Sequence, residues 1–448
     1  MSMLAALPFV RLLQQQGGRI YTVGGTVRDE LLGRPRKDID LLVTGLPQET
    51  LTRLLRRQGR VQLTGRAFGV IKFSPHGWDE LPIDIALPRT EVSTGIGHRD
   101  FQVSFDHTLP IETDLARRDF TINALAVDLA TNQLIDPFGG RQDLENHLLR
   151  QVSDQAFPED PLRMLRGVQL AARFVLSLEV DTRHAMQVYA ASIATVAPER
   201  IAEELRKLFQ AHSPAAGFVL MQETGLLHHI LPEIAVSDDS TEQSAALFAR
   251  TLRRVDAVQQ RQELVHQGHL DLLLTALFQD SQKISGSTVA SAEQAHRRLE
   301  TLRMTMLGAN LNRIATLIEA CDFILDDLAS PAALRHFAAH LGPDTTLMLF
   351  DLRLADCLAN AVATSNPRAC IDVMDLRQRL QHEIAAQTPF SVKELAINGH
   401  DLQRLGMPPG PQMGQMLQRL LLRVLDNPDH NTRDALTQFV QQEMQQVF

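Results

Sequence analysis

Two aspartates, Asp38 and Asp40, lie two positions apart in the segment RKDIDLLV, residues 36–43. On a strand, side chains two positions apart point to the same side, so these carboxylates would lie close together. Burying two like charges is unfavourable without a partner. A divalent cation turns this repulsion into affinity, because Mg²⁺ prefers oxygen ligands. Taken alone, such a pair is more typical of a turn or a helix cap, so its neighbours must decide.

A candidate phosphate-binding turn precedes the aspartates. Gly24 and Gly25 separate an apolar run from a helix-like segment, and two glycines let backbone N–H groups approach an anion. Arg28, on the first helical turn, can reach the same anion. A phosphate cradle followed by two carboxylates is what metal-dependent phosphoryl or nucleotidyl transfer requires. Asp84, in LPIDIAL, either completes the metal site from a neighbouring strand or marks the exposed face of its own strand.

A small sheet is needed to position these residues. The strand-like segments are RIYTVGG, DIDLLVTG, VQLTGRAFGVIKFSP and LPIDIALPRTE. The segments TVRDELLG, with Thr26 as N-cap, and PQETLTRLLRRQG predict helices, and TDLARRDFTINALAVDL predicts a helix that runs into an apolar segment. The polar segment STGIGHRDFQVSFDHTLPIE predicts a mobile loop. After about residue 155 the pattern predicts helices and essentially no strand.

The composition is that of a globular protein without a membrane span. A length of 448 residues predicts several domains, and 44% hydrophobic residues is ordinary for such a chain. No apolar stretch approaches the length of a membrane span, and the N-terminus predicts a first helix rather than a signal peptide. Three widely spaced cysteines indicate a reducing, cytoplasmic location. A net charge of −9 disfavours indiscriminate nucleic-acid coating but permits local basic patches.

Ordered motifs along the chain resemble those of class II tRNA nucleotidyltransferases and bacterial poly(A) polymerases, in the polymerase-β nucleotidyltransferase superfamily. The segment VGGTVRDELLGRPRKDID is similar to the opening motif of that family. Four further motifs follow in the family's order: RRDFTINA, DPFGGRQDL, EDPLRMLR and PERI, which begin at residues 117, 136, 159 and 198. The segment NGHDLQRLGMPPGPQMGQML also resembles the family's C-terminal region, so the resemblance covers most of the chain.

The resemblance implies an α+β fold, in which an N-terminal polymerase-β-like head with a small mixed sheet is followed by helical neck, body and tail. The implied bounds are 1–150 for the catalytic head, 151–215 for the nucleotide-selecting neck, 216–385 for the body and 386–448 for the tRNA-binding tail.

The resemblance also implies Mg²⁺ as cofactor, with Asp38 and Asp40 as catalytic metal ligands and Asp84 as a candidate third carboxylate. The implied nucleotide-binding residues are Gly24, Gly25, Arg28, Arg118, Asp119, Asn123, Asp160, Arg163, Arg166 and Gln169.

A base-reading pair is expected on a helix over residues 159–173. Asp160 and Arg163 are three positions apart, so on one helix they would share a face. An Asp accepts hydrogen bonds and an Arg donates them, so the pair can match the Watson–Crick edge of cytosine or adenine. In the resembled family this pair selects CTP and then ATP without a template. The spacing also fits an ordinary surface ion pair.

Arg166 continues the same face and suits a triphosphate. Gln169 stands where the family usually has another Arg. One phosphate contact is therefore expected to be weaker, or to be supplied by Arg173 or Arg117.

The implied activity is template-independent addition of CCA, or of its terminal A, to the 3′ end of tRNA from CTP and ATP. The expected partners are tRNA, ATP and CTP, and neither a membrane nor DNA is expected. A full-length loop before residue 112 disfavours a CC-only enzyme. The strand GRAFGVIKF, with Gly69 where poly(A) polymerases carry an Arg, and the lack of a basic C-terminal extension favour tRNA as substrate. An A-adding partner enzyme, a poly(A) polymerase and an inactive RNA-binding homologue stay open as alternatives.

The segment LLLTALFQDSQK resembles a decayed HD-type metal phosphohydrolase site. Gln279 stands where a metal-binding His would be, Asp280 follows it, and Asp356 would be another remnant. An amide cannot replace an imidazole in such a site, so no hydrolase activity is expected. The same residues are also ordinary for a helical region.

Overall fold

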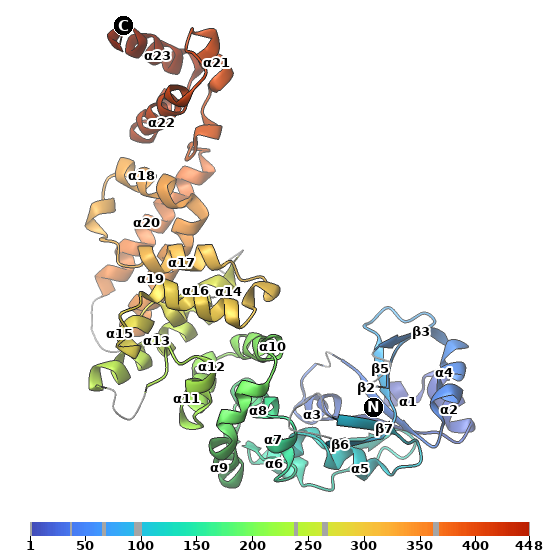
Figure 1. The fold of residues 1–448 in the computed structure, drawn as a ribbon. Helices are drawn as coiled ribbons and strands as arrows, with labels where there is room; N and C mark the ends of the chain where they lie inside the picture. Colours follow the sequence, from blue (N-terminus) through green and yellow to red (C-terminus); the bar gives the residue numbers. More distant parts are fainter. Residues whose placement is uncertain are drawn as a thin grey trace. The chain divides into compact units, whose positions relative to one another are not determined.

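The computed structural model describes residues 2–35, 38–64, 69–93, 101–236, 241–261, 268–361 and 367–447. The chain divides into two compact units, Met1–Ile230 and Leu231–Phe448 (Figure 1). The first unit combines strands with helices, and in the described part of the second every regular element is helical. The structure thus has the expected α+β class. None of the described helices is long and apolar enough to cross a membrane.

A mixed sheet of seven strands, in the order β3-β4-β5-β2-β1-β8-β9, is the centre of the first unit. Its strands are β1 (Arg19–Val23), β2 (Asp40–Thr44), β3 (Gly59–Thr64), β4 (Val70–Pro75), β5 (Ile83–Ala86), β8 (Ala126–Asp128) and β9 (Leu134–Ile135). Strand β2 pairs antiparallel with β1 and parallel with β5. It therefore lies inside the sheet and begins with Asp40.

The apolar run of β2 is explained by burial on both faces of the sheet. Leu41 and Val43 belong to one core cluster with helices α2 (Pro8–Gln15) and α4 (Gln48–Arg56). Leu42, which points to the opposite face, packs in a second cluster that includes α5 (Ile111–Ala116). A strand buried on both sides is rigid, so it holds Asp40 at a fixed place on the sheet edge.

The turn between β1 and α3 (Gly25–Leu31) corrects the expectation that Thr26 caps the helix. The N-cap is Gly24, whose φ of 65° lies in the left-handed region that glycine adopts without strain. Thr26 lies inside the helix instead. Its Oγ1 accepts a hydrogen bond from the Asp40 N–H at 3.0 Å and donates one to the Asp38 carbonyl at 3.3 Å. The hydroxyl therefore ties the turn to the start of β2.

The segment expected to be a mobile loop contains strand structure. β6 (Arg89–Ser93) and β7 (Phe101–Phe105) form an antiparallel pair, and α5 follows at Ile111. The loop expectation was wrong for these residues. Hydrogen bonds between the two strands satisfy their backbone groups, and the polar sequence carries no pattern that predicts this pairing. Residues 94–100 of that segment lie outside the described residues, as do 36–37 and 65–68.

Helices follow in the rest of the first unit: α7 (Ala156–Glu159), α8 (Leu162–Phe174), α9 (Val180–Tyr189), α10 (Pro198–Phe209), α11 (Pro214–Glu223) and α12 (Leu226–Ile230). One short strand departs from the expected all-helical pattern, since β11 (Ser177–Leu178) pairs parallel with β10 (Leu148–Leu149). Gly167 lets α8 approach the sheet domain closely. A Cβ there would lie 2.6 Å from Phe120 and from Met186.

The second unit is a stack of helices. Its main elements are α13 (Glu242–Gln259), α14 (His269–Phe278), α16 (Ser291–Thr301), α17 (Leu311–Ala320), α18 (Pro331–Leu341), α19 (Pro343–Ala361), α20 (Pro367–Ala385), α22 (Pro411–Asp426) and α23 (Arg433–Val447). An apolar cluster joins α18, α19, α20, α22 and α23.

Arg254 is fully buried within the second unit and brings together the residues of the suspected HD remnant. Its Nη2 lies 2.7 Å from Asp280 Oδ2 and its Nε 2.8 Å from Asp356 Oδ1. The Gln279 amide, turned to place its oxygen toward the guanidinium, accepts from the same side chain at 2.9 Å. A guanidinium thus occupies the centre of the cluster. Within the described ranges, no group of three His, Cys, Asp or Glu residues is arranged to hold a metal ion.

Candidate active site

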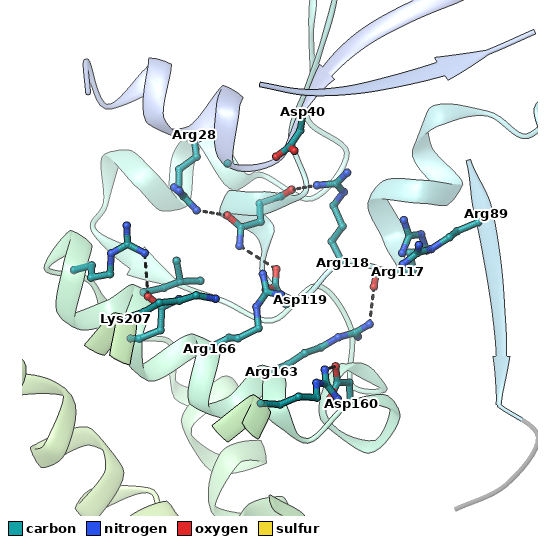
Figure 2. A pocket seen from close by; sticks show the side chains of 16 residues that line it. Arg28, Asp40, Arg89, Arg117, Arg118, Asp119, Asp160, Arg163, Arg166 and Lys207 are labelled. Carbon is teal, nitrogen blue, oxygen red and sulfur yellow. Dashed lines mark hydrogen bonds and ion pairs between the residues drawn. The ribbon is translucent and has the colours of Figure 1, made fainter. Parts of the chain in front are cut away.

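A strongly cationic pocket of about 580 Å³ opens between the sheet and helices α8 and α10 (Figure 2). Nine Arg or Lys side chains line it against three carboxylates, so it suits a polyanion. The lining residues are Gly25, Arg28, Asp40, Arg89, Arg117, Arg118, Asp119, Asn123, Asp160, Arg163, Arg166, Gln169, Leu170, Arg173, Arg200 and Lys207. Ten of the residues expected from the sequence are among them, while Gly24, Asp38 and Asp84 are not.

Asp40 is a carboxylate of this pocket that feels the charge of two other carboxylates, Asp84 and Asp38. It stands opposite Asp84 in the parallel register of β2 and β5. Burial raises the pKa of Asp40 to about 6; the Arg118 guanidinium opposes this rise, and the Asp84 and Asp38 carboxylates reinforce it. Such a group binds a proton or another cation readily.

The other two acidic residues differ in their surroundings. Asp84 is already neutralised, since Lys72 Nζ lies 3.0 and 3.2 Å from its two carboxylate oxygens. Asp38 is exposed and precedes β2. Among the described residues nothing donates a hydrogen bond to its carboxylate. The structure thus places Asp40 at the start of β2 and Asp38 two residues earlier, outside the strand and outside the pocket lining.

The turn at Gly24 and Gly25 is closely surrounded by arginines. A Cβ at Gly24 would lie 2.4 Å from Arg118 Nη1, so only glycine fits there. Arg28 is buried and extensively bonded: Nη1 donates to Asn123 Oδ1 at 2.6 Å, and Nε and Nη2 donate to Asp29 at 2.9 and 2.7 Å. These bonds hold its guanidinium at the edge of the pocket.

Asp114 is a functional residue that sequence reasoning missed. Its side chain is fully buried and binds both arginines of the RRD motif. Arg117 donates to Oδ1 at 2.9 and 2.6 Å, and Arg118 donates to Oδ2 at 3.2 Å. The signal was the spacing of three and four residues on a helix end, which places all three side chains together.

Asp119 links the sheet domain to α8. Its Oδ1 accepts hydrogen bonds from Asn123 Nδ2 at 3.0 Å and from the Phe120 N–H at 2.9 Å, and Oδ2 lies 3.1 Å from Arg166 Nη2. Burial alone would raise the pKa of Asp119, but Arg166 and these hydrogen bonds hold it below the ordinary value. The carboxylate therefore stays charged and fixes Arg166 in the pocket.

The expectation that Asp160 and Arg163 lie on one helix was wrong, although both line the pocket. Asp160 ends α7 with an extended backbone, φ −140° and ψ 98°, and α8 begins after Pro161. A residue before proline is disfavoured in the helical region, which explains the break. Asp160 Oδ2 accepts from Arg200 Nη2 at 2.9 Å, and Arg163 Nη2 donates to the Arg117 carbonyl at 2.9 Å.

Gln169 is buried on α8 and lines the pocket, one helical turn before Arg173. Its Oε1 accepts a hydrogen bond from Arg173 Nη1 at 3.2 Å. Arg89, Arg200 and Lys207 are pocket residues that the sequence did not assign, and Arg173 was named only as an alternative phosphate contact. The motif PERI contains Arg200. Its ion pair with Asp160, 40 positions away, cannot be predicted from the neighbouring sequence.

Three profiles of protein families match parts of the chain. Residues 20–150 match the poly(A) polymerase head domain, and residues 176–237 match a family described as "Probable RNA and SrmB- binding site of polymerase A". Residues 345–440 match domain 2 of tRNA nucleotidyltransferases.

Similar curated proteins carry the name multifunctional CCA protein. That of Laribacter hongkongensis is 41% identical over 218 residues, which are 48% of this chain and 51% of the relative. That of Methylobacillus flagellatus is 43% identical over 219 residues, 48% of this chain and 50% of the relative. The chain thus spans about half the length of the curated relatives it matches.

Solved structures with the same fold cover nearly the whole chain. The CCA-adding enzyme of Bacillus stearothermophilus in complex with CTP has a TM-score of 0.73 and 24% identity, covering 99% of this chain and 98% of that one. The Thermotoga maritima CCA-adding enzyme complexed with tRNA has a TM-score of 0.65 and 22% identity, covering 97% and 94%. At these identities the likeness shows the fold.

Proposed function

We propose that the chain, parts of which match the poly(A) polymerase head domain and domain 2 of tRNA nucleotidyltransferases, is a class II tRNA nucleotidyltransferase that adds CCA, or its terminal A, to the 3′ end of tRNA. The substrates are CTP, ATP and tRNA, and pyrophosphate is released. No nucleic-acid template takes part. The names and bound nucleotides of its relatives support this choice of substrates.

The observation that carries the proposal is the arrangement of charge in the pocket. Figure 2 draws Asp40 on one side and Asp160 with Arg163 on the opposite side, with Arg118 and Arg166 between them. A nucleoside triphosphate has a corresponding order of groups: a reactive phosphate chain at one end and a base edge at the other. The cationic lining matches the phosphate charge, and the Asp–Arg pair matches a base edge.

Asp38 and Asp40 fit a Mg²⁺ ion, since both offer carboxylate oxygens. Burial and the neighbouring Asp84 and Asp38 carboxylates raise the pKa of Asp40, although Arg118 and Lys72 oppose the rise. Asp38 and Asp40 would hold the ion, which would supply activation of the attacking hydroxyl and neutralisation of charge on the leaving group. Asp84 is paired with Lys72, so in our proposal it supports Asp40 electrostatically and is not a direct ligand.

The side chains of the pocket position the reacting groups. The 3′-oxygen of the RNA forms a bond to the α-phosphorus of the nucleotide as the bond to pyrophosphate breaks. Arg118 and Arg166 hold phosphate oxygens, and the backbone N–H groups after Gly24 lie beside them. Their fixed positions lower the cost of orienting the triphosphate.

Asp160 and Arg163 select the base in this proposal. Asp160 offers an acceptor oriented by Arg200, and Arg163 offers donors from a guanidinium held by the Arg117 carbonyl. Gln169 and Asn123 complete the lining without adding charge. Because the pair comes from the protein, the bases it accepts do not depend on a template.

The expected division of labour is part of the same proposal. Residues 1–150 form the catalytic head and 151–215 the neck that selects the nucleotide. Residues 216–385 form the body, and 386–448 form the tail that holds tRNA by its shape and backbone. A cytoplasmic location also belongs to the proposal, supported by three free cysteines.

The test is extension of three tRNAs that end before CCA, after C and after CC, with Mg²⁺, CTP and ATP. Extension of all three to CCA identifies a CCA-adding enzyme, and extension of the third alone identifies an A-adding enzyme. No incorporation into any of them would exclude nucleotidyl transfer and favour an inactive RNA-binding homologue.

Poly(A) polymerase activity is the second candidate, because two of the matching families are described in terms of polymerase A. An unstructured oligonucleotide separates the two functions. A tRNA-specific enzyme extends it far more slowly than tRNA, whereas equal extension into a long A tract would identify a poly(A) polymerase.

A further inference from the structure

Most cations of the pocket have an acidic partner, and Arg173 has none in the described part of the chain. Seven cations each contact a carboxylate: Arg28 with Asp29, Arg117 and Arg118 with Asp114, Arg163 with Glu159, Arg166 with Asp119, Arg200 with Asp160, and Lys207 with Glu204. Arg173, the penultimate residue of α8, lies within ion-pair distance of no carboxylate in the described part of the chain. Its charge is therefore available to a ligand.

The surroundings of Arg173 add positive charge. The guanidinium carbons of Arg28, Arg34 and Arg173 lie 4.3, 4.6 and 5.4 Å from the centre of one ring, that of Phe174. Burial lowers the pKa of Arg173, the neighbouring Arg28 and Arg34 lower it further, and Asp29 opposes the change. Three guanidinium groups, with Asp29 and Glu204 as the nearby carboxylates, form a site that a bound anion would stabilise.

The guanidinium of Arg173 is held in a fixed place. Gln169 is 4% exposed, and its Oε1 accepts one hydrogen bond from Arg173 Nη1 at 3.2 Å. Phe174, 6% exposed, packs beside it. An Arg side chain has five N–H donors, so one bond to Gln169 orients the group and leaves donors for a ligand.

From this geometry we propose that Arg173, oriented by Gln169, binds a phosphate group in the pocket. The planar guanidinium matches two oxygens of one phosphate, and both Gln169 and Arg173 line the same cavity as Asp40 and Asp160. Two substrates could supply that phosphate: the triphosphate of the nucleotide or the backbone of the RNA 3′ end. This inference rests on the proposed function only for the names of these two substrates.

The first experiment compares Arg173→Gln with the wild-type full chain in steady-state extension assays. Loss of a charge-assisted contact is expected to raise KM about tenfold or more with a much smaller change in kcat. A rise in KM for CTP and ATP assigns the phosphate to the nucleotide, and a rise in KM for tRNA assigns it to the RNA. Unchanged values of both would overturn the proposal.

Two further variants test the geometry. Arg173→Lys keeps the charge but loses the planar guanidinium, which can donate two hydrogen bonds to one phosphate. Its KM should therefore lie between those of the wild type and Arg173→Gln. The double variant Gln169→Arg, Arg173→Gln moves a guanidinium one helical turn along the same pocket wall and should recover part of the lost affinity. Failure of this rescue, with a folded protein by circular dichroism, would contradict a role for the guanidinium itself.

The matched control is Arg206→Gln. Arg206 lies on α10, does not line the pocket, and forms an exposed ion pair with Glu203. Its KM values should equal those of the wild type.

An equilibrium arm separates failure of this inference from failure of the proposed function. CTP, ATP and unextended tRNA are each titrated alone into the wild type and into Arg173→Gln, with binding as the readout. Weaker binding of one of them by the variant supports the phosphate contact even if no extension is seen. Equal affinities of both proteins for all three would overturn it.

Discussion

Most cationic side chains in the pocket form an ion pair with a carboxylate. These ion pairs fix the position of each cationic group. Asp29, Asp114 and Glu204 do not line the pocket, yet they hold Arg28, Arg117, Arg118 and Lys207. At the scale of single residues, the cations of the site are therefore held by carboxylates that lie outside the pocket lining. This explains how so many like charges can be held close together before a substrate arrives.

The first prediction concerns the carboxylate pair. Asp40→Asn keeps the size of the side chain but removes its charge, so turnover on tRNA should fall at least about a thousandfold because metal activation is lost. Binding of tRNA should change little, as measured by a filter or fluorescence titration. Asp38→Ala should behave likewise. Turnover that persists in both variants would remove these residues from the mechanism.

A second prediction concerns Arg200, which forms a 2.9 Å contact with Asp160, the residue that we propose reads the base. In Arg200→Gln the carboxylate loses the partner that orients it, so discrimination between CTP and ATP should change by about fivefold or more, as expected for loss of about 1 kcal/mol of a charged contact. The measurement is kcat/KM for each nucleotide on tRNAs ending before the relevant position. A uniform loss for both nucleotides would indicate a structural role only.

At the scale of the elements, the strongest local patterns predicted the fold well. The run of β2 is apolar because both its faces are buried. Such a strand can be predicted from its own residues, without knowing which distant residues it contacts. The break between α7 and α8 also has a local cause, Pro161, but the helical spacing around it suggested continuity. The β6–β7 pair depends on cross-strand partners, which a polar sequence does not reveal.

The candidate site divides in the same way. Gly24, Gly25, Asp38 and Asp40 carry their signal in a short segment, so the sequence located them. The contacts Arg200–Asp160 and Lys72–Asp84 join separate elements, and only the fold brings them together. The sequence named Arg173 only as an alternative phosphate contact. Its proposed role depends on the lack of a carboxylate partner among the described residues, which only the structure reveals.

The C-terminal end of α8 carries a strained residue and gives a third prediction. Val175 is 77% exposed and adopts φ 56°, ψ 55°, a left-handed conformation that is unfavourable for a β-branched side chain. Val175→Asn should raise the free energy of unfolding of the first unit by about 0.5–1 kcal/mol, since Asn tolerates this conformation.

Chemical denaturation followed by the fluorescence of the single tryptophan, Trp78, measures this change, because Trp78 lies in the first unit. The control is Val180→Asn, an equally exposed valine in a helical conformation on α9. Its stability should change by a few tenths of a kcal/mol at most. Equal effects of the two substitutions would contradict the role of backbone strain.

At the scale of the whole molecule, the two units hold their cores together by different means. The first is built on apolar clusters on both faces of a sheet, whereas the second also contains the charged cluster around Arg254. Their stabilities can therefore be changed separately, and Trp78 reports on the first unit alone.

The fourth prediction is that Arg254→Met destabilises the second unit by about 3–5 kcal/mol, because it leaves Asp280 and Asp356 buried without their shared cation. Far-UV circular dichroism should show an earlier transition for the helices of this unit, while Trp78 fluorescence keeps its own transition. The control is Arg297→Gln, which breaks an exposed pair with Glu293 and should have almost no effect.

The fifth prediction is the pH dependence of that cluster. Burial opposes ionisation of Asp280 and Asp356, but Arg254, assisted by Arg250 and Lys283, holds the pKa of both below the ordinary value. A lowered pKa in the folded state means that the cluster contributes fully above the unfolded value near 3.9. The contribution is lost as pH falls through the lower, folded-state values.

Denaturant titrations at a series of acidic pH values test this sign. The stability difference between wild type and Arg254→Met should be largest near neutral pH and should shrink as the carboxylates take up protons. A difference that grows on acidification would contradict the assignment of the ion pairs.

The Thr26 hydroxyl bonds to the backbone on both sides of Ile39, accepting from Asp40 and donating to Asp38. Thr26 lies on α3, which begins at the turn that we propose binds phosphate. Its two partners lie at and just before the start of β2, where we propose that the metal binds. One hydroxyl therefore fixes the distance between the Gly24–Gly25 turn and the start of β2, the two elements that would bind a triphosphate. The turn and the strand therefore cannot move independently of each other. A bound substrate has to fit a distance between them that the backbone already fixes.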